Sequence, residues 1–397
     1  MKNQIREWAP EKRWNPFNSH KLLTHVERWR HIQRGKPIPA PILVTIDPVN
    51  ACDLDCVWCN AQLIRQKRSG RMISEKTLMR IADFLPHWGA DNPYVKTGVE
   101  AVCIAGGGEP LLNPAIGNFI NRLYRRNIEI GVVTNGTQIH KYLAALSKAT
   151  WVGVSIDAAK RETFNRLKRL PLNSEKFDQI IENIILLSKY AKKHKSRLGW
   201  KHSAYGISFK YLLYKENISE IYQAAQLAKK IGCKNIHFRP AGTAWDKLGS
   251  DNEIRFLPKD IALYNAQITK ALALDDKNFN VYGVTHKFNS QFGIANYFSK
   301  CYALFMTAVI MPPTNVINNP DAFTVGLCCD RRGDAKIELC KNISDPKEIN
   351  KMWGSRYHWM LHDSLAIEKE CPRCTYQPHN EIYEQVIMND SMTHKFI

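Results

Sequence analysis

Short runs of apolar residues alternate along the chain with segments whose apolar residues recur at helical spacing. Strands are predicted where the runs are short and rich in β-branched residues, at Ile42–Ile46, Val99–Ala105, Ile128–Thr134, Trp151–Ile156, Ile207–Tyr214 and Asn235–Arg239. Helices are predicted between them, at Ser74–His87, Pro114–Arg126, Gln138–Ser147, Ser174–His194 and Ser219–Ile231. This alternation predicts an α/β fold with a parallel sheet. Ligands are then expected at the carboxyl ends of the strands.

The alternation covers only the middle of the chain, residues 41–240. Residues 1–40 predict a basic helical extension that ends in a proline-rich stretch. Residues 241–295 predict a linker with one bridging helix, Pro258–Leu274. Beyond this linker the alternation is lost and cysteines become frequent. Residues 296–397 are therefore predicted to form a small second domain organised by metal.

Composition adds a strong positive charge to this picture. The chain has 397 residues, 44% hydrophobic and 23% charged, which is typical of a globular protein. Its 56 Lys and Arg against 37 Asp and Glu give a net charge of +19, with the excess concentrated in residues 1–41 and 158–201. Such a surface favours anionic partners, including nucleic acid, acidic peptides and phosphorylated metabolites. A basic face that serves solubility is the alternative.

No apolar run is long enough for a membrane span, and the N-terminus lacks the apolar core of a signal peptide. We therefore expect a cytoplasmic protein with no membrane partner. In a reducing compartment, the 11 cysteines argue against a disulfide framework and for metal binding or catalysis.

Three of these cysteines, Cys52, Cys56 and Cys59, follow the first predicted strand in the stretch ACDLDCVWCNA. Structural zinc takes four protein ligands, normally from two separated pairs of cysteines. This loop supplies three ligands and no nearby fourth. Three thiolates on a cubane iron–sulfur cluster would leave one iron open to a ligand from outside the protein. Zinc remains the alternative for this spacing.

The triplet resembles the cluster motif of the radical S-adenosylmethionine (radical SAM) enzymes. Further matches to that family follow in order: IAGGGEPLLNP after the second strand, VVTNGT after the third, and WVGVSIDAAKRETFNRLKR over the fourth strand and the following helix. Each match alone would be weak, but together they are specific. The resemblance implies a partial (β/α)6 TIM-like barrel with a small C-terminal iron–sulfur domain.

The resemblance also implies the chemistry. A [4Fe–4S] cluster on the three cysteines would bind the amino and carboxylate groups of SAM through its open iron. An electron from an external donor of the flavodoxin or ferredoxin type would then cleave SAM. The product would be a 5′-deoxyadenosyl radical, which abstracts a hydrogen atom from a substrate C–H bond.

SAM contacts are implied in the loops after the first two strands. The candidates are Trp58, Gly106, Gly107, Gly108, Glu109 and Pro110. Trp58 stands where the family places an aromatic side chain near the adenine, with simple packing as the alternative. The glycines allow close approach of a ligand to the backbone, and the Glu109 carboxylate would accept from the SAM ammonium. A tight turn at a strand end is the alternative for this second loop.

Other polar residues lie at or near the ends of later strands. Asn135, Ser155 and Asp157 would contact the ribose or carboxylate of SAM by resemblance, although each could instead cap a helix. Lys210 and Arg239 place charges in otherwise apolar runs. Either could meet the SAM carboxylate, meet the substrate, or form a salt bridge at the rim.

The cysteine-rich tail resembles the SPASM extension of radical SAM enzymes, or its one-cluster form called twitch. This resemblance implies an auxiliary [4Fe–4S] cluster on Cys301, Cys328, Cys371 and Cys374. Cys329 is the alternative to Cys328, and Cys340 is a weaker candidate. The long gap between Cys301 and Cys328 departs from the family pattern and leaves the ligand set open. A zinc site is the alternative here, and Cys103 and Cys233 are interpreted as small buried hydrophobes.

The leading hypothesis is a radical SAM oxidoreductase that matures a ribosomal peptide or protein. The auxiliary cluster would take an electron from the product radical, which gives an oxidation or a cross-link. Candidates for a base are Lys210, His237 and Tyr302. Alternative substrates are an aminocyclitol or carbohydrate, and RNA or a nucleotide.

Two hypotheses of other kinds compete with this enzyme. One is a zinc- or cluster-containing nucleic-acid-binding protein, and the other is a family member whose clusters are only structural. The GGGEP segment and the repeated strand–helix units favour the enzyme, because a binding module would need neither.

Overall fold

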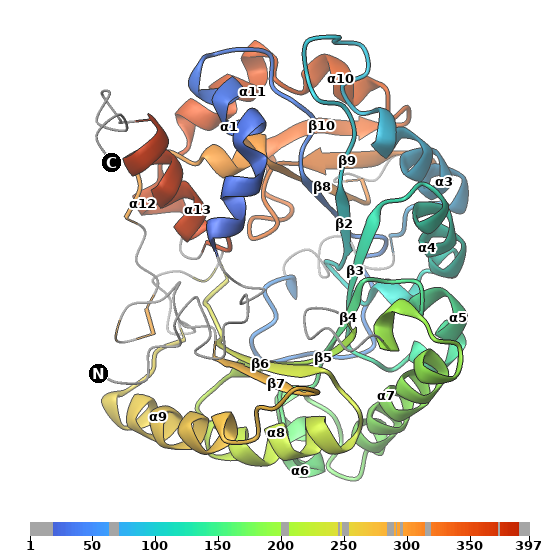
Figure 1. Cartoon of the computed structure of the whole chain (residues 1–397), viewed down its shortest axis with the longest axis vertical. Helices are drawn as coiled ribbons and strands as arrows, with labels where there is room; N and C mark the ends of the chain where they lie inside the picture. The colour runs from blue at the N-terminus through green and yellow to red at the C-terminus, as the bar shows by residue number, and fades with distance from the viewer. Residues whose placement is uncertain are drawn as a thin grey trace.

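A ten-stranded sheet runs through the described part of the chain. The computed structural model describes residues 19–62, 71–199, 206–244, 247, 254–283, 290, 292–293, 297–313, 319–371 and 374–388. The strand order is β10-β9-β8-β1-β2-β3-β4-β5-β6-β7. Figure 1 shows the sheet curving from β10 through β3 and β4 to β6 and β7, with helices on its outer side.

The predicted strands form the parallel centre of this sheet. They are β1 (Leu43–Ile46), β2 (Ala101–Ile104), β3 (Glu129–Thr134), β4 (Trp151–Ser155), β5 (Gly206–Leu213) and β6 (Asn235–Pro240). Each pairs in parallel with the next along the chain. The predicted α/β fold with a parallel sheet is confirmed.

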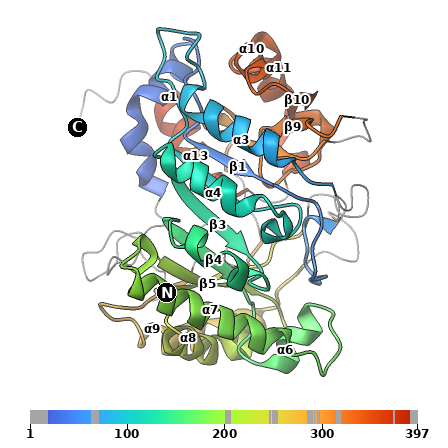
Figure 2. The ribbon, with the colours of Figure 1, turned by 90° about the vertical axis from the view of Figure 1, so that its right-hand side faces the viewer.

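Helices return the chain between these strands and cover the outer face, as Figure 2 shows for α3, α4 and α7. Their bounds are α3 (Glu75–Phe84), α4 (Ile116–Arg125), α5 (Leu143–Leu146), α6 (Arg161–Leu167), α7 (Lys176–Lys193) and α8 (Ile221–Lys230). Helix α3 begins after Ser74, whose side chain accepts from Thr77 N as an N-cap. The helix predicted at Gln138–Ser147 is divided into a 3₁₀ turn, Ile139–Lys141, and the short α5.

The two faces of the central strands differ in chemistry. On β4, Val152 and Val154 are fully buried. The added Cβ of Gly136 would meet both Val154 and Ile180 of α7, so this is the helix-covered face. The alternate residues Trp151, Gly153 and Ser155 belong to the inner face of the curved sheet. The inner face is therefore where polar and aromatic side chains gather.

The basic N-terminal extension contains two helical elements, η1 (Ser19–His25) and α1 (Val26–Gln33), and residues 34–40 after them are not helical. Residues 1–18 lie outside the described residues. Buried Arg28 anchors this extension, because its guanidinium donates to Ala40 O and pairs with Glu100 Oε1 at 2.8 Å.

The bridging helix is present as α9 (Pro258–Leu272). The sequence analysis missed β7 (Asn280–Gly283), which extends the sheet in parallel beside β6. Its four residues are all buried, so they carry no alternation that would indicate a strand.

The cysteine-rich tail contributes strands to the same sheet. These are β8 (Thr307–Met311), which pairs in parallel with β1, and the antiparallel β9 (Phe323–Gly326) and β10 (Glu338–Ile343). Its helices include α10 (Glu348–Met352), α11 (Arg356–Ser364), α12 (Ile367–Glu370), α13 (Gln377–Glu381) and the π-helical η10 (Ile382–Met388). A domain boundary near residue 296 stays a prediction, but the sheet is continuous across it. Within the described ranges, no helix has both the length and the apolar character needed to cross a membrane.

Candidate functional site

The cysteine triplet lies in the loop that leaves the carboxyl end of β1. Cys52, Cys56 and Cys59 are half-buried and form no disulfide. Cys59 N donates to Cys56 O at 3.0 Å, which closes a tight turn. Val57 N donates to Leu167 O at 3.0 Å and so fixes this turn against the end of α6. The loop is thus held at the edge of the sheet where ligands were expected.

The GGGEP segment packs directly on this loop. Glu109 N donates to Ala51 O at 2.7 Å, next to Cys52. A Cβ added to Gly108 would lie only 2.1 Å from Ala51 O, so a side chain at this position would push the two loops apart. Gly106 is restricted in the same way, since its added Cβ would lie 2.8 Å from Gly108 O. The two glycines therefore allow backbone segments to lie closer together than side chains at these positions would permit.

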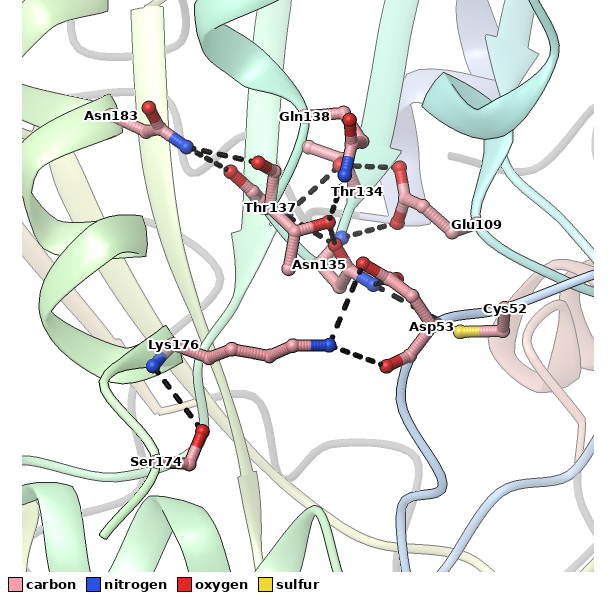
Figure 3. Close-up of polar contacts among 11 residues, drawn as sticks. Cys52, Asp53, Glu109, Thr134, Asn135, Thr137, Gln138, Ser174, Lys176 and Asn183 are labelled. Atoms are coloured by element: carbon pink, nitrogen blue, oxygen red, sulfur yellow. Dashed lines mark hydrogen bonds and ion pairs between the residues drawn. The ribbon is translucent and has the colours of Figure 1, made fainter. Parts of the chain in front are cut away.

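The Glu109 carboxylate lies between the ends of β2 and β3 (Figure 3). It is 2% exposed and accepts hydrogen bonds from Thr134 Oγ1 at 2.6 Å, Asn135 N at 2.6 Å and Leu111 N at 3.0 Å. Burial raises the pKa of Glu109 to about 7, although these donors favour the charged form. A nearby cation would stabilise the charged form of this buried carboxylate. The predicted contact between Glu109 and the SAM ammonium would be such an interaction.

Asn135 connects β3 to the cysteine loop. Its Nδ2 donates to Asp53 Oδ1 at 2.6 Å and lies 3.9 Å from Cys52 Sγ. Lys176 of α7 holds the same aspartate from the other side, because its Nζ donates to Asp53 O at 2.9 Å (Figure 3). The sequence analysis missed Asp53 and Lys176. The only signal for Asp53 was its place inside the triplet.

Trp58 is 8% exposed and packs beneath the loop against Tyr214, with ring centroids 5.5 Å apart. Lys168 Nζ lies 5.1 Å from the Trp58 ring centroid and forms a buried ion pair with Asp157 at 2.5 Å. Asp157 also accepts from Leu212 N at 2.6 Å. The structure therefore places Asp157 in an ion pair with Lys168, a residue that the sequence analysis missed.

Lys168 also reaches the triplet. It hydrogen-bonds the Cys56 thiol, and its charge opposes the increase in the pKa of that thiol that burial causes. Lys168 at Cys56 and the Asn135 amide near Cys52 would both stabilise negative charge on the sulfurs. The cysteine ligands of an iron–sulfur cluster are thiolates and carry such charge.

Within the described residues, no three His, Cys, Asp or Glu side chains come close enough together to hold a single metal ion. A cubane cluster does not need that closeness, since each thiolate binds a different iron. The donor set and its surroundings therefore fit a cluster on the triplet.

The tail brings four cysteines together beneath α13. Cys301 has Cys371, Cys374 and Cys328 as electrostatic neighbours. Asn380 lies between two of these thiols, because its Nδ2 donates to Cys301 Sγ at 3.4 Å and lies 3.9 Å from Cys374 Sγ. These are the four cysteines predicted for the auxiliary cluster.

The two adjacent cysteines of the tail point to different places. Cys329 Sγ lies 3.9 Å from the hydroxyl of Tyr376 and is an electrostatic neighbour of Cys103 on β2. Cys340 is buried on β10 with Glu348 as its charged neighbour. Of the two adjacent cysteines, Cys328 is the one that neighbours Cys301 and Cys374, and the choice of the fourth ligand stays a prediction.

Three of the remaining candidates lie on the inner face of the sheet, and Tyr302 lies outside that group. Lys210 of β5 is in register with Ser155 on β4 and His237 on β6, and Arg239 follows on the same face. Tyr302 lies before β8, 9% exposed and stacked on Tyr383. Tyr302 is thus at the amino end of a strand, away from the loops that carry the triplet.

The two cysteines that were interpreted as small buried hydrophobes, Cys103 and Cys233, differ in their burial. Cys233 is buried as predicted. Cys103 is half-buried and lines a cavity of about 530 Å³ together with Trp151, Met306 and Tyr383.

The profile of the Radical SAM superfamily matches residues 46–228. This range includes the triplet, the GGGEP segment, and strands β2 to β5. Residues 46–228 of the chain form a radical SAM domain. Proteins of this superfamily are enzymes, so the prediction of an enzyme is confirmed, and the domain implies a [4Fe–4S] cluster and SAM as cofactors.

Curated relatives share part of this radical SAM domain. A GTP 3′,8-cyclase of Thermodesulfovibrio yellowstonii is 29% identical over 143 residues, which cover 34% of this chain and 41% of the relative. An AdoMet-dependent heme synthase of Methanosarcina barkeri is 22% identical over 201 residues, half of each protein. The chain therefore matches half or less of the length of these relatives.

Solved structures share the fold over more of the chain. SuiB of Streptococcus suis, bound to the precursor peptide SuiA, has a TM-score of 0.58 at 15% identity and covers 87% of this chain and 72% of SuiB. The enzyme anSMEcpe with bound AdoMet has a TM-score of 0.55 at 15% identity, covering 81% and 83%. The predicted radical SAM fold is confirmed.

A buried ion pair connects the two groups of cysteines. Asp47, at the end of β1 and 1% exposed, pairs with Arg332 Nε at 2.6 Å. The Arg332 guanidinium also donates to Cys329 O. The pair ties the loop that carries Cys328 and Cys329 to the strand that leads into the triplet.

We expect Asp47→Asn and Arg332→Met each to lower the free energy of unfolding by about 3–5 kcal/mol, because each leaves a buried partner unpaired. The double variant Asp47→Asn/Arg332→Met should lose much less than the sum of the single losses. Urea unfolding of the four apo proteins, followed by circular dichroism, measures this coupling. Additive losses would show that the pair does not act as a unit.

The raised pKa of Glu109 predicts that SAM binding depends on pH. Below about pH 7 Glu109 is protonated and cannot serve a SAM ammonium as a carboxylate. The SAM dissociation constant of the reconstituted protein should therefore rise as pH falls from 8 to 6, approaching about tenfold per pH unit. Glu109→Gln should bind SAM more weakly and with no such dependence. Equilibrium dialysis with the exposed Glu129→Gln as the matched control tests this, and the same slope in Glu109→Gln would contradict it.

Proposed function

We propose that this protein cleaves SAM reductively to modify a peptide or protein substrate by hydrogen-atom abstraction. The observation that carries the proposal is the meeting of three motifs at one edge of the sheet. The triplet, Glu109 and Asn135 come from the ends of β1, β2 and β3, and they are joined by the contacts to Ala51 and Asp53. A [4Fe–4S] cluster on the triplet would supply the electron that cleaves SAM to the 5′-deoxyadenosyl radical.

The chain's own residues would bind and orient SAM at this edge. Glu109 would accept from its ammonium, and Asn135 would hold the cysteine loop through Asp53. Trp58 packs next to the triplet with Leu167 and Ala241, where the edge that stays exposed would border the adenine. Lys168 neutralises Asp157 and hydrogen-bonds the Cys56 thiol.

The tail would hold an auxiliary [4Fe–4S] cluster on Cys301, Cys328, Cys371 and Cys374. Asn380 donates to Cys301 Sγ, and Arg331 hydrogen-bonds the Cys371 thiol. Hydrogen bonds to cluster sulfurs are one of the factors that set the reduction potential. These donors favour the reduced cluster, because they stabilise the added negative charge. That suits a group that takes an electron from a product radical.

A peptide substrate is supported by the fold. Structures of SuiB with the precursor peptide SuiA and of anSMEcpe with AdoMet and the Kp18Cys peptide share this architecture at 15% identity.

We propose a flavodoxin or ferredoxin as the electron donor and a cytoplasmic setting.

A nucleotide substrate is the second candidate. The GTP 3′,8-cyclases match this chain at 27–29% identity, and the net charge of +19 suits a phosphorylated ligand. The aminocyclitol hypothesis stays a prediction from the sequence.

The first experiment measures 5′-deoxyadenosine after anaerobic reconstitution with iron and sulfide and addition of dithionite and SAM. Wild type should form it, and the Cys52/Cys56/Cys59→Ala variant should not, while losing about four irons per chain, as expected for one cubane. The matched control is Cys233→Ala, a buried cysteine in neither group. Zinc in place of iron, with no 5′-deoxyadenosine, would contradict the proposal.

The auxiliary cluster is tested by replacing the two adjacent cysteines separately. Cys328→Ala should lower the iron content and alter the electron paramagnetic resonance signal that remains in the triplet variant. Cys329→Ala should leave both unchanged, because its thiol points toward Tyr376. The reverse result would assign Cys329 as the ligand, and no residual iron in the triplet variant would exclude a second cluster.

A further inference from the structure

The inner face of the sheet borders the cavity of about 530 Å³ near the amino ends of β1 to β4. Ala101 of β2 is paired with Leu43 of β1, and Cys103 of β2 is paired with Gly131 of β3. Gly131 is in turn paired with Trp151 of β4, so these five lining residues share the inner face. Alanine, cysteine and glycine fill little volume. The inner face therefore leaves space at this end of the sheet.

The first and last helical segments of the described chain cover the other side of this cavity. Leu22 and His25 of η1 line it, together with Tyr376 before α13 and Tyr383 of η10. Helix η1 packs against α13, and α1 packs against η10. Figures 1 and 2 both show the blue N-terminal helix beside the red C-terminal helices. Neither segment belongs to the sheet, so they close a space that the strands leave open.

The carboxylates of the cavity lining already have partners inside the protein. Thr150 Oγ1 donates to Glu129 Oε2, and Glu129 also pairs with Arg197 at 2.7 Å. Glu100 pairs with Arg28 at 2.8 Å. A charged ligand would have to lose its hydration to enter this cavity, and these paired carboxylates would compensate it poorly.

Much of the remaining lining is apolar or neutral. Trp151 and Met306 contribute an indole and a thioether, and the Tyr383 hydroxyl donates to Met306 Sδ at 3.5 Å. Burial lowers the pKa of His25 from its usual value, so its ring is neutral at pH 7. Lys21 is exposed. The lining therefore suits an uncharged, apolar ligand group.

The cavity is large enough for an aromatic side chain. Protein interiors rarely contain voids larger than a water molecule, and ligand pockets begin at roughly 300 Å³. An apolar cavity of roughly 150 Å³ already takes up benzene. A volume of about 530 Å³ therefore admits an indole or phenyl ring together with part of a peptide backbone.

The cavity also lies within reach of the candidate SAM site. Ala101 is three residues before Ile104, where β2 ends and the loop of Glu109 follows. Three residues of extended chain span about 10 Å. A peptide with one side chain in the cavity would reach the carboxyl ends of the strands within about three residues.

We propose that this cavity binds an aromatic or large aliphatic side chain of the peptide substrate and anchors the peptide inside the barrel. The inference rests on the proposed function and deepens it, because it names the kind of side chain that the substrate carries. The apolar lining and the paired carboxylates select against a charged side chain at this position.

The test measures ligand binding to the reconstituted holoprotein by anaerobic titration calorimetry, with no turnover. The probes are the N-acetylated amides of tryptophan, leucine, glutamate and lysine. Wild type should bind the tryptophan probe most tightly, and the leucine probe more weakly because it buries less apolar surface. The glutamate and lysine probes should bind at least about tenfold more weakly than the tryptophan probe, because each would lose the hydration of its charge.

Variants at Ala101 locate the binding. Ala101→Phe places a ring in the cavity and should lower the affinity for the tryptophan probe about tenfold or more, as expected when an apolar side chain is no longer buried. Ala144→Phe, at an exposed position of α5, is the matched control and should bind as wild type. Ala101→Met fills the space with a more flexible side chain and should also weaken binding. Thermal unfolding checks that the variants fold, since a side chain that enters empty space should not lower the Tm, whereas overpacking would.

Three results would overturn the proposal: no binding of the tryptophan probe to wild type, equal binding by wild type and both Ala101 variants, or binding of a charged probe as tight as that of the tryptophan probe. Binding of free indole without binding of the tryptophan probe would also overturn it, because the cavity would then admit a ring but no peptide. Formation of 5′-deoxyadenosine without probe binding would remove the anchor and leave the proposed function. Probe binding without 5′-deoxyadenosine would do the reverse, so the two can fail separately.

Discussion

The architecture of the candidate site depends on one backbone contact, the hydrogen bond from Glu109 N to Ala51 O. It exists because Gly108 has no side chain that would strike Ala51 O. The contact places the Glu109 carboxylate beside the triplet and at the end of β3, where Thr134 and Asn135 N bind it. Three loops from three strands are thereby held in one arrangement, so binding SAM would require little further ordering.

A second constraint connects this site to the tail. Strand β1 leads into the triplet at its carboxyl end and pairs with β8 of the tail along its edge. The pair between Asp47 and Arg332 joins the end of the same strand to the loop of Cys328 and Cys329. The spacing between the two groups of cysteines is thus set by one strand and one ion pair. A fixed spacing matters if electrons pass from substrate to the tail, since transfer depends on distance.

The sequence predicted those parts of the protein that have local signals. Strands β1 to β6 have apolar runs, and the triplet and the GGGEP segment have fixed spacing. The missed residues act through partners distant in the chain. Arg332 meets Asp47 across 285 positions, and Lys176 meets Asp53 across 123. Strands β7, β8 and β9 were missed because all of their residues are buried, which removes the alternation of a half-buried strand.

The inner face shows why a local anomaly in the sequence is informative. Lys210 and Arg239 interrupt apolar runs, and a parallel sheet covered by helices normally has no place for such charges. In the structure both occupy the inner face, where Gly131 and Gly153 provide the space for Trp151 and Lys210. The register between strands decides which small residue lies beside which large one, and the sequence does not reveal that register. The glycines of β3 and β4 therefore allow a tryptophan and a lysine to occupy the inner face of strands whose sequences are largely apolar.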